Sequence, residues 1–472
     1  MKLWNKIFYR QNPQKYELKD DHLERSLRVR DLLALGLGII VSTSIFTLPG
    51  EVAAMHTGPA VIISFIIAAV VAGMVALVYA EMAGAMPFAG SAYTWINVIF
   101  GELPGWVVGW ALLAEYFIGL SFVISGISSN LKPILASIGI KFPAFLANPL
   151  GKDGGIVDIL AIALLLLVMF LVSRNLSKIT LVENLFVVLK IFAILLFVVV
   201  GATSIHMANF HPFIPEYHVT ANGAFGGWQG IYAGVSMIFV SYIGFDAIAA
   251  NSAEAIEPQK TMPLGIVGSL GIASVFFILV SLVLIGVLPY QHYAASAEPI
   301  GIALRAINHP IVATIVQLIA VLGMITAAIG LMLSGSRLIY SFSRDGMLPK
   351  VFSKLDKNKQ PKNAVILISV VSMVISSVLP FSFLSQLISA GTIIAFMFVS
   401  VGLFFLRKRE GKDIQQPAFK VPAYPLLPIL AFVASLLVFI GLDKAAKLYT
   451  LVWFILGIAI YFVYGIRNAN RD

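Results

Sequence analysis

Long apolar stretches separated by short polar breaks run through almost the whole chain, and they predict a bundle of membrane-spanning helices. With about 20 apolar residues needed for each crossing, the pattern predicts twelve spans. They cover residues 32–56, 60–86, 104–130, 156–173, 182–203, 228–251, 264–288, 311–341, 363–380, 384–406, 424–442 and 448–466. No series of short alternating segments indicates a β-barrel. Because a helix satisfies its own backbone polar groups in lipid, we expect an all-α integral membrane protein.

The spacing of these spans predicts four parts. We expect a cytoplasmic N-terminal tail over residues 1–31, a first group of five spans over 32–203, a second group of five over 228–406, and two further spans over 424–466. The tail carries eight basic side chains and has room for a surface helix. None of the connections is large enough for a soluble domain.

Composition and charge support this interpretation and add an orientation. Hydrophobic residues make up 59% of the chain and charged residues 12%, with a mean hydropathy of +0.93, whereas soluble domains have roughly 25% charged residues. With the N-terminus inside, 25 of the 32 Lys and Arg residues fall on the cytoplasmic side and six on the other. The positive-inside rule therefore predicts a multi-pass cell-membrane protein with both termini in the cytoplasm. The net charge of +9 then reflects loop placement, and we expect no nucleic-acid partner.

Several function classes lack the residues that they need. The chain has no cysteine, which excludes disulfides and iron–sulfur clusters, and it has no GxxxxGK[ST] nucleotide loop. All seven histidines lie in the tail, in loops or at span ends, which argues against haem, zinc or Ser/His chemistry inside the membrane. No repeated filter or pore ring suggests a channel. We therefore expect a secondary transporter, with no enzymatic activity, metal or cofactor; no protein partner can be inferred.

Two spans are interrupted by glycine and by hydroxylated residues at matching positions, the first and the sixth. The string GLGIIVSTSIFTLPG places three polar residues in mid-span, at Ser42, Thr43 and Ser44. The string SMIFVSYIGFDAIAA places Ser241, Tyr242 and Gly244 in mid-span. A helix broken there exposes N–H groups that attract a carboxylate and carbonyls that attract an ammonium, as a zwitterion requires. The alternative is two continuous helices whose hydroxyls bond to their own backbone and whose glycines allow close packing.

These strings, together with Glu254 and Pro258 after the sixth span and SRDGMLP (residues 343–349) after the eighth, resemble the amino acid–polyamine–organocation superfamily. Within it, the chain looks like a bacterial member of the cationic amino acid transporter family. The resemblance covers nearly the whole chain. It implies a LeuT-like fold with a five-plus-five inverted repeat, broken helices 1 and 6, two extra helices and transport by alternating access.

The resemblance also implies a substrate site. It assigns the substrate carboxylate to the amides of Thr43 and Ser44, and the substrate ammonium to the carbonyls of Ile40, Val240 and Ile243. Relatives often have glycine where this chain has Ser42 and Ser44, so the local backbone is expected to differ. Three further side chains are candidates for gating or for contact with the substrate side chain, although each could instead be a packed core residue: Phe239, Tyr242 and Met324.

Three charged residues lie well inside spans, where an ionisable group costs on the order of 2.5–3.5 kcal/mol. Lys190 lies about 12 Å deep at ~1.5 Å per residue, and it is expected to meet carbonyls of the first helix. There it could exchange a proton, or it could be a fixed charge that holds helices together. The resemblance supports proton coupling without a sodium site, since sodium-independent members place a lysine there. For Glu115 two roles are open, in a proton path or in a structural hydrogen bond. For Asp246 we expect a structural role, such as capping the second half-helix.

The expected substrate is a small neutral L-amino acid such as alanine, carried by proton symport. The predicted pocket offers no obvious acidic side chain for a second substrate cation, and an unpaired guanidinium would be costly to bury there. Two alternatives stay open: a facilitator or exchanger of arginine and lysine, and an amino-acid sensor that uses a transporter fold without net flux.

Overall fold

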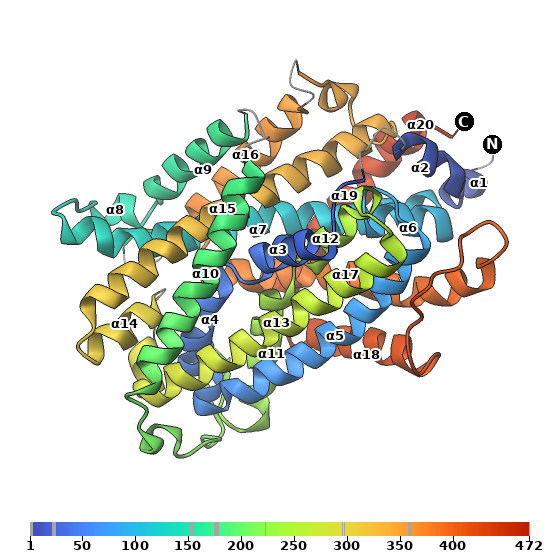
Figure 1. Ribbon diagram of the computed structural model, residues 1–472. Helices are drawn as coiled ribbons and strands as arrows, with labels where there is room; N and C mark the ends of the chain where they lie inside the picture. Colours follow the sequence, from blue (N-terminus) through green and yellow to red (C-terminus); the bar gives the residue numbers. More distant parts are fainter. Residues whose placement is uncertain are drawn as a thin grey trace.

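Helices form nearly all of the computed structural model, which describes residues 3–20, 25–151, 154–173, 179–221, 223–294, 296, 298–356 and 360–471 (Figure 1). The tail and the first two predicted spans contain α1 (Leu3–Ile7), α2 (Pro13–Asp20), α3 (Val29–Ile40), α4 (Thr43–Val52) and α5 (Val61–Ala85). The rest of the first half contains α6 (Ala92–Ile99), α7 (Glu102–Ser137), α8 (Ala144–Ala147), α9 (Ile159–Val172) and α10 (Ile179–Ala202). A short hairpin of β1 (His218–Thr220) and β2 (Gly223–Phe225) follows.

The second half repeats this alternation of long and short helices. It contains α11 (Gly227–Ile238), α12 (Phe245–Ala250), α13 (Pro258–Val287), α14 (Pro299–Ala306), α15 (Pro310–Arg344), α16 (Lys362–Val378) and α17 (Phe381–Arg409). The last helices are α18 (Leu426–Gly441), α19 (Lys444–Ile460) and α20 (Ile466–Asn468).

Within the described residues, eight segments are long and apolar enough to cross a membrane, and three shorter apolar helices accompany them. One of the eight, Thr43–Ala85, covers parts of two predicted spans, because α4 joins α5 through a π-helical and a 3₁₀ turn. The chain is therefore a multi-pass helical membrane protein. The count of twelve crossings and the inverted repeat stay predictions.

The long helix α7 runs through the interior of the bundle and packs against α15, α16 and α17. Another long helix, α13, packs against α5 and α3 (Figure 1). The short helix α3 contacts α13, and α4, which follows it, contacts α7. The junction of α3 and α4 therefore lies between these two long helices. The predicted span over 104–130 is shorter than α7, which begins at Glu102 and ends at Ser137. The sequence analysis did not predict α6, α14 or the hairpin.

The N-terminal tail is more than a surface segment. Tyr16 and Ile7 are buried in the core of the protein. The Tyr9 hydroxyl donates to the Arg471 carbonyl, and the Gln11 amide donates to the Asn470 carbonyl. The two ends of the chain therefore lie side by side at one end of the bundle (Figure 1), which agrees with an even number of crossings.

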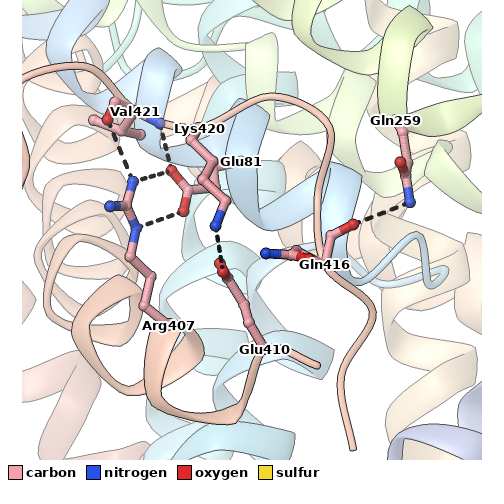
Figure 2. Close-up of polar contacts among 7 residues, drawn as sticks. All are labelled: Glu81, Gln259, Arg407, Glu410, Gln416, Lys420 and Val421. Atoms are coloured by element: carbon pink, nitrogen blue, oxygen red, sulfur yellow. Dashed lines mark hydrogen bonds and ion pairs between the residues drawn. The ribbon is translucent and has the colours of Figure 1, made fainter. Parts of the chain in front are cut away.

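A buried ion pair joins α17 to α5, and the loop after α17 bonds to the same carboxylate (Figure 2). Arg407 Nε and Nη2 donate to the two carboxylate oxygens of Glu81 at 2.8 and 2.9 Å, and the Val421 N–H donates to the same carboxylate. Glu81 is fully buried, and the Arg407 guanidinium lies 3.9 Å from the centre of the Tyr424 ring. Such a bidentate pair satisfies both charges away from water.

We predict that Glu81→Gln lowers the melting temperature of the purified protein markedly. The change leaves the Arg407 charge poorly compensated, and breaking a buried pair typically costs about 3–5 kcal/mol. The control is Asp413→Asn, which removes the exposed partner of Arg409 and typically costs about 0–1 kcal/mol. Equal melting temperatures for the two variants, measured in the same detergent, would contradict a stabilising role for the buried pair.

Candidate functional site

The first predicted break lies between α3 and α4. Helical hydrogen bonding stops at Ile40, Val41 has φ −84° and ψ 68°, Ser42 has φ −123° and ψ −131°, and the next helix begins at Thr43. The Ser42 side chain does not cap α4, so the first N–H groups of α4 are left for another acceptor. The chain therefore has a free helix N-terminus inside the bundle.

The second break lies between α11 and α12 and is longer. A 3₁₀ turn over Phe239–Tyr242 follows α11, Ile243 is extended, and α12 begins after Gly244. Gly244 has φ +125°, and a Cβ there would lie 2.6 Å from Ile39 Cγ2. Only glycine fits, for both the backbone angle and the close contact. The two breaks therefore touch each other, as the paired interruptions in the sequence predict.

A cavity of about 50 Å³ lies at this contact. From the two broken segments, its lining includes Ile39, Ile40, Ser42, Thr43, Ser44, Val240, Ile243, Gly244 and Ala247. From the surrounding helices it includes Glu115, Tyr116, Gly119, Phe122, Val123, Leu331 and Ile388. This volume is sufficient for several water molecules or a small solute. Most of the predicted backbone contacts thus surround one space.

Several buried hydroxyls near the breaks have no hydrogen-bond partner among the described residues: Ser42 Oγ, Thr43 Oγ1 and Ser241 Oγ. Ser42 and Thr43 line the cavity, whereas Ser241 does not. Ser44 Oγ donates only a long bond of 3.5 Å to the Ile40 carbonyl. Since buried polar groups are rarely left unpaired, these side chains suit a polar solute in the cavity. The continuous-helix alternative, in which they bond back to their own helix, does not describe Ser42 or Thr43.

The carbonyls near the breaks have different surroundings. The Val240 carbonyl accepts the Ile243 N–H at 3.2 Å and keeps one lone pair. The Gly38 carbonyl, in the last turn of α3, accepts a 2.7 Å hydrogen bond from Lys190 Nζ. Lys190 is almost fully buried on α10. Its ammonium therefore lies against a carbonyl of the first helix, in the arrangement that the sequence analysis expects.

Two carboxyl groups lie beside the cavity on facing helices. Glu115, on α7, lines the cavity, and its Oε2 accepts a 2.7 Å hydrogen bond from Thr392 Oγ1 of α17. Asp246, the second residue of α12, is fully buried next to it. The sequence predicted no obvious acidic side chain in the pocket. Glu115 corrects that prediction, because it lies on the face of α7 that lines the cavity.

Three predicted side-chain contacts lie outside the cavity lining. Tyr242 points toward α5, and its hydroxyl donates to the Phe65 carbonyl at 2.9 Å. Phe239 packs on Phe396, and Met324 is fully buried on α15, where Leu331 lines the cavity instead. All three side chains therefore agree with the alternative that they are packed core residues and not substrate contacts.

The sequence pointed to Glu115 but not to the other cavity residues of α7. Glu115, Gly119, Phe122 and Val123 recur at helical spacing, so they share one face of this helix. Glu115, the only charged residue well inside that span, marks this face, and the pattern could have been found by reading forward from it. Leu331 and Ile388 carry no comparable signal. No cluster of metal-ligating side chains occurs among the described residues.

A second, larger cavity of about 440 Å³ lies toward the end of the bundle that holds both termini. Tyr116 lines both cavities. Polar residues around the larger one include Asn251, Glu254, Arg337 and Arg344, and Arg337 Nη1 lies 3.8 Å from Glu254 Oε1. The Arg344 carbonyl accepts from Asn470, which places the C-terminus at its rim. Tyr116 is therefore the residue that the two cavities have in common.

Comparisons with known proteins agree with this geometry. The family model described as "Amino acid permease" matches residues 27–465. The "Branched-chain amino acid permease BcaP" of Lactococcus lactis subsp. cremoris (strain MG1363) is 54% identical over 97% of this chain and 98% of its own length. The "Methylthioribose transporter" of Bacillus subtilis (strain 168) is 34% identical over 96% and 95%. The "Cationic amino acid transporter 2, vacuolar" of Arabidopsis thaliana is 33% identical over 82% and 60%.

The absence of cysteine from the chain allows a direct test of access to the cavity. We predict that Ser42→Cys reacts with a small water-soluble methanethiosulfonate reagent, because Ser42 lines the cavity between the breaks and a larger cavity adjoins it at Tyr116. Ser400→Cys is the control, since Ser400 is fully buried on α17 outside both linings. Labelling is measured by mass spectrometry on purified protein, and equal labelling of the two variants would mean that the cavity is not open to water.

Proposed function

This chain belongs to the amino acid permease family, and we propose that it transports neutral aliphatic L-amino acids across the cell membrane. The observation that carries the proposal is the contact between two broken helices around a cavity, where a free helix N-terminus lies near free carbonyl lone pairs. An amino acid has an anion and a cation two bonds apart, so it needs both kinds of backbone group at one place.

Each end of the substrate has named partners. The carboxylate binds the N–H groups at the start of α4, around Thr43 and Ser44, with the unpartnered hydroxyls of Ser42 and Thr43 beside it. The ammonium binds carbonyls at the ends of the broken segments, at Ile40, Val240 and Ile243. Such contacts do not depend on the substrate side chain, so they select the amino-acid group in general.

The substrate side chain is selected by the apolar part of the cavity wall. Phe122, Val123, Leu331 and Ile388 line it and offer no polar partner to a substrate side chain. The name of the 54% identical relative, a branched-chain amino acid permease, supports aliphatic side chains larger than that of alanine. We therefore extend the expected substrate range from alanine to valine, leucine and isoleucine. Each additional buried methylene contributes about 0.8 kcal/mol, or about fourfold in affinity.

Cationic amino acids are the second candidate, because Glu115 on the wall could pair with a substrate cation and a 33% identical relative is named a cationic amino acid transporter. Against this, Glu115 already accepts a hydrogen bond from Thr392 and lies against Asp246. Drawing Glu115 toward a substrate guanidinium would break that arrangement. The neutral substrate requires no such change.

Proton coupling completes the proposal. Lys190 holds the Gly38 carbonyl of α3 by a hydrogen bond that a charged ammonium strengthens. Losing the proton weakens the attachment of α3 to α10, so the protonation of Lys190 and the position of α3 are linked. We propose proton symport without a sodium site, twelve spans in a LeuT-like inverted repeat, alternating access, and both termini in the cytoplasm.

Uptake into proteoliposomes tests the substrate and the coupling together. We predict that labelled leucine and labelled alanine accumulate, that an inward proton gradient increases the accumulation, and that excess arginine or lysine does not compete. Strong competition by arginine and lysine would instead support the cationic transporter. Binding of leucine without any flux would support the sensor hypothesis. Accumulation that does not change with the proton gradient would contradict proton coupling.

The packing around Lys190 supplies a test that leaves its charge in place. A Cβ on Gly323 of α15 would lie 2.3 Å from Lys190 Cδ and 2.4 Å from Cγ. Gly323→Ala must therefore displace the lysine stem, and we predict that both Gly323→Ala and Lys190→Ala abolish proton-driven accumulation. Gly330→Ala is the control on the same helix, because a Cβ there meets nothing within 4 Å. If Gly323→Ala accumulates substrate as well as Gly330→Ala does, the packing of Lys190 against α15 is not needed for coupling.

A further inference from the structure

Asp246 is a charged residue whose position the substrate site does not explain. It is the second residue of α12 and is fully buried. No well-aligned hydrogen bond reaches its carboxylate oxygens from the described residues, although backbone N–H groups at the start of α12, at Gly244, Asp246 and Ala247, interact with them. Such imperfect contacts leave a buried carboxylate costly, so a further partner is needed.

The side chain that faces Asp246 is Glu115 of α7, which interacts with it directly. Glu115 has one oxygen bonded to Thr392 and is itself almost fully buried. The other titratable side chains around the two carboxyls are Tyr79 of α5 and Tyr116 of α7. Two carboxyl groups thus meet in the membrane with hydroxyl-bearing neighbours.

Two ionised carboxylates carry no hydrogen between them and repel each other strongly in a medium of low polarity. One proton removes both problems, because a protonated carboxyl can donate a hydrogen bond to its ionised neighbour. The lack of a well-aligned donor to Asp246 is what such a pair presents when its hydrogen is not counted. Tyr79, whose hydroxyl is buried without a hydrogen-bond partner, interacts with Asp246 only electrostatically.

We propose that Glu115 and Asp246 share a single proton, and that this proton holds α12 against α7 beside the substrate cavity. The role of this proton in transport rests on the proposed function, whereas the placement of the two carboxyl groups does not. Glu115 lines the cavity, so the carboxylic O–H bond can break by passing its proton to a water there. Both groups are then anionic, and their repulsion favours movement of α12 away from α7. Asp246 thereby becomes a second coupling residue, in addition to the structural role expected from the sequence.

Infrared spectroscopy of the purified full chain near neutral pH tests the shared proton without any transport. We expect a carboxylic-acid C=O stretching band in the wild type that disappears in both Glu115→Gln and Asp246→Asn. In each variant the new amide donates the hydrogen bond, so the remaining carboxyl ionises. Glu102→Gln is the control on the same helix, because Glu102 is already paired with Arg471, and it should keep the band. A band lost in Glu115→Gln but kept in Asp246→Asn would overturn the sharing, as would the absence of the band from the wild type.

Transport assays then test the purpose of the pair. Because an amide can replace the proton as donor, we expect Asp246→Asn to exchange labelled for unlabelled leucine across proteoliposomes, yet to lose accumulation driven by a proton gradient. Full gradient-driven accumulation by this variant would overturn the coupling role. If the wild type shows the shared-proton band but moves no amino acid, the proposed function fails while the proton pair stands.

Discussion

Unpaired backbone groups inside the bilayer are the constraint on which the rest of this structure depends. Helical hydrogen bonding stops at Ile40 and again after Tyr242, and each interruption leaves N–H and C=O groups without helical partners. Leaving such a group unsatisfied costs on the order of 1–3 kcal/mol, and irregular backbone is tolerated at this depth only where protein or a cavity surrounds it. The chain meets the constraint by placing the two breaks against each other, with Gly244 packed on Ile39.

What the sequence could predict follows from what is local. The breaks were predictable, since glycine and hydroxyl side chains interrupt otherwise apolar spans. The resemblance to the transporter family implied backbone contacts at Ile40, Thr43 and Ile243, and these three residues line the cavity. Side-chain orientation was not predictable. In a soluble helix the polar face marks the outside, but in a membrane helix both faces are apolar, so the sequence does not distinguish Phe239, which packs inside the scaffold, from Phe122, which lines the cavity.

The pairing of ionisable residues near the span ends could not be predicted, for a related reason. Glu115, Lys190 and Asp246 stand out in the sequence because lipid makes a charge at mid-span costly. Glu81 and Glu102 lie closer to span ends, where water or headgroups could satisfy them, so their sequence positions call for no partner. In the structure both are buried and paired, with Arg407 and Arg471. Their partners are hundreds of residues away, and only the tertiary fold brings them together.

The two half-helices at the terminal end of the bundle, α3 and α12, contact each other. The backbone of Leu27 pairs with that of Ala255, and the Ile256 N–H donates to the Leu27 carbonyl at 2.8 Å, so the segments flanking these helices are joined by main-chain bonds that do not titrate. Two attachments of this unit to the surrounding helices do involve ionisable side chains, Lys190 on the Gly38 carbonyl and Glu115 beside Asp246. In the proposed mechanism, loss of a proton weakens the first attachment by removing charge and the second by creating repulsion. Both changes would favour release of the same unit, so two proposed proton sites on different helices would act on one movement.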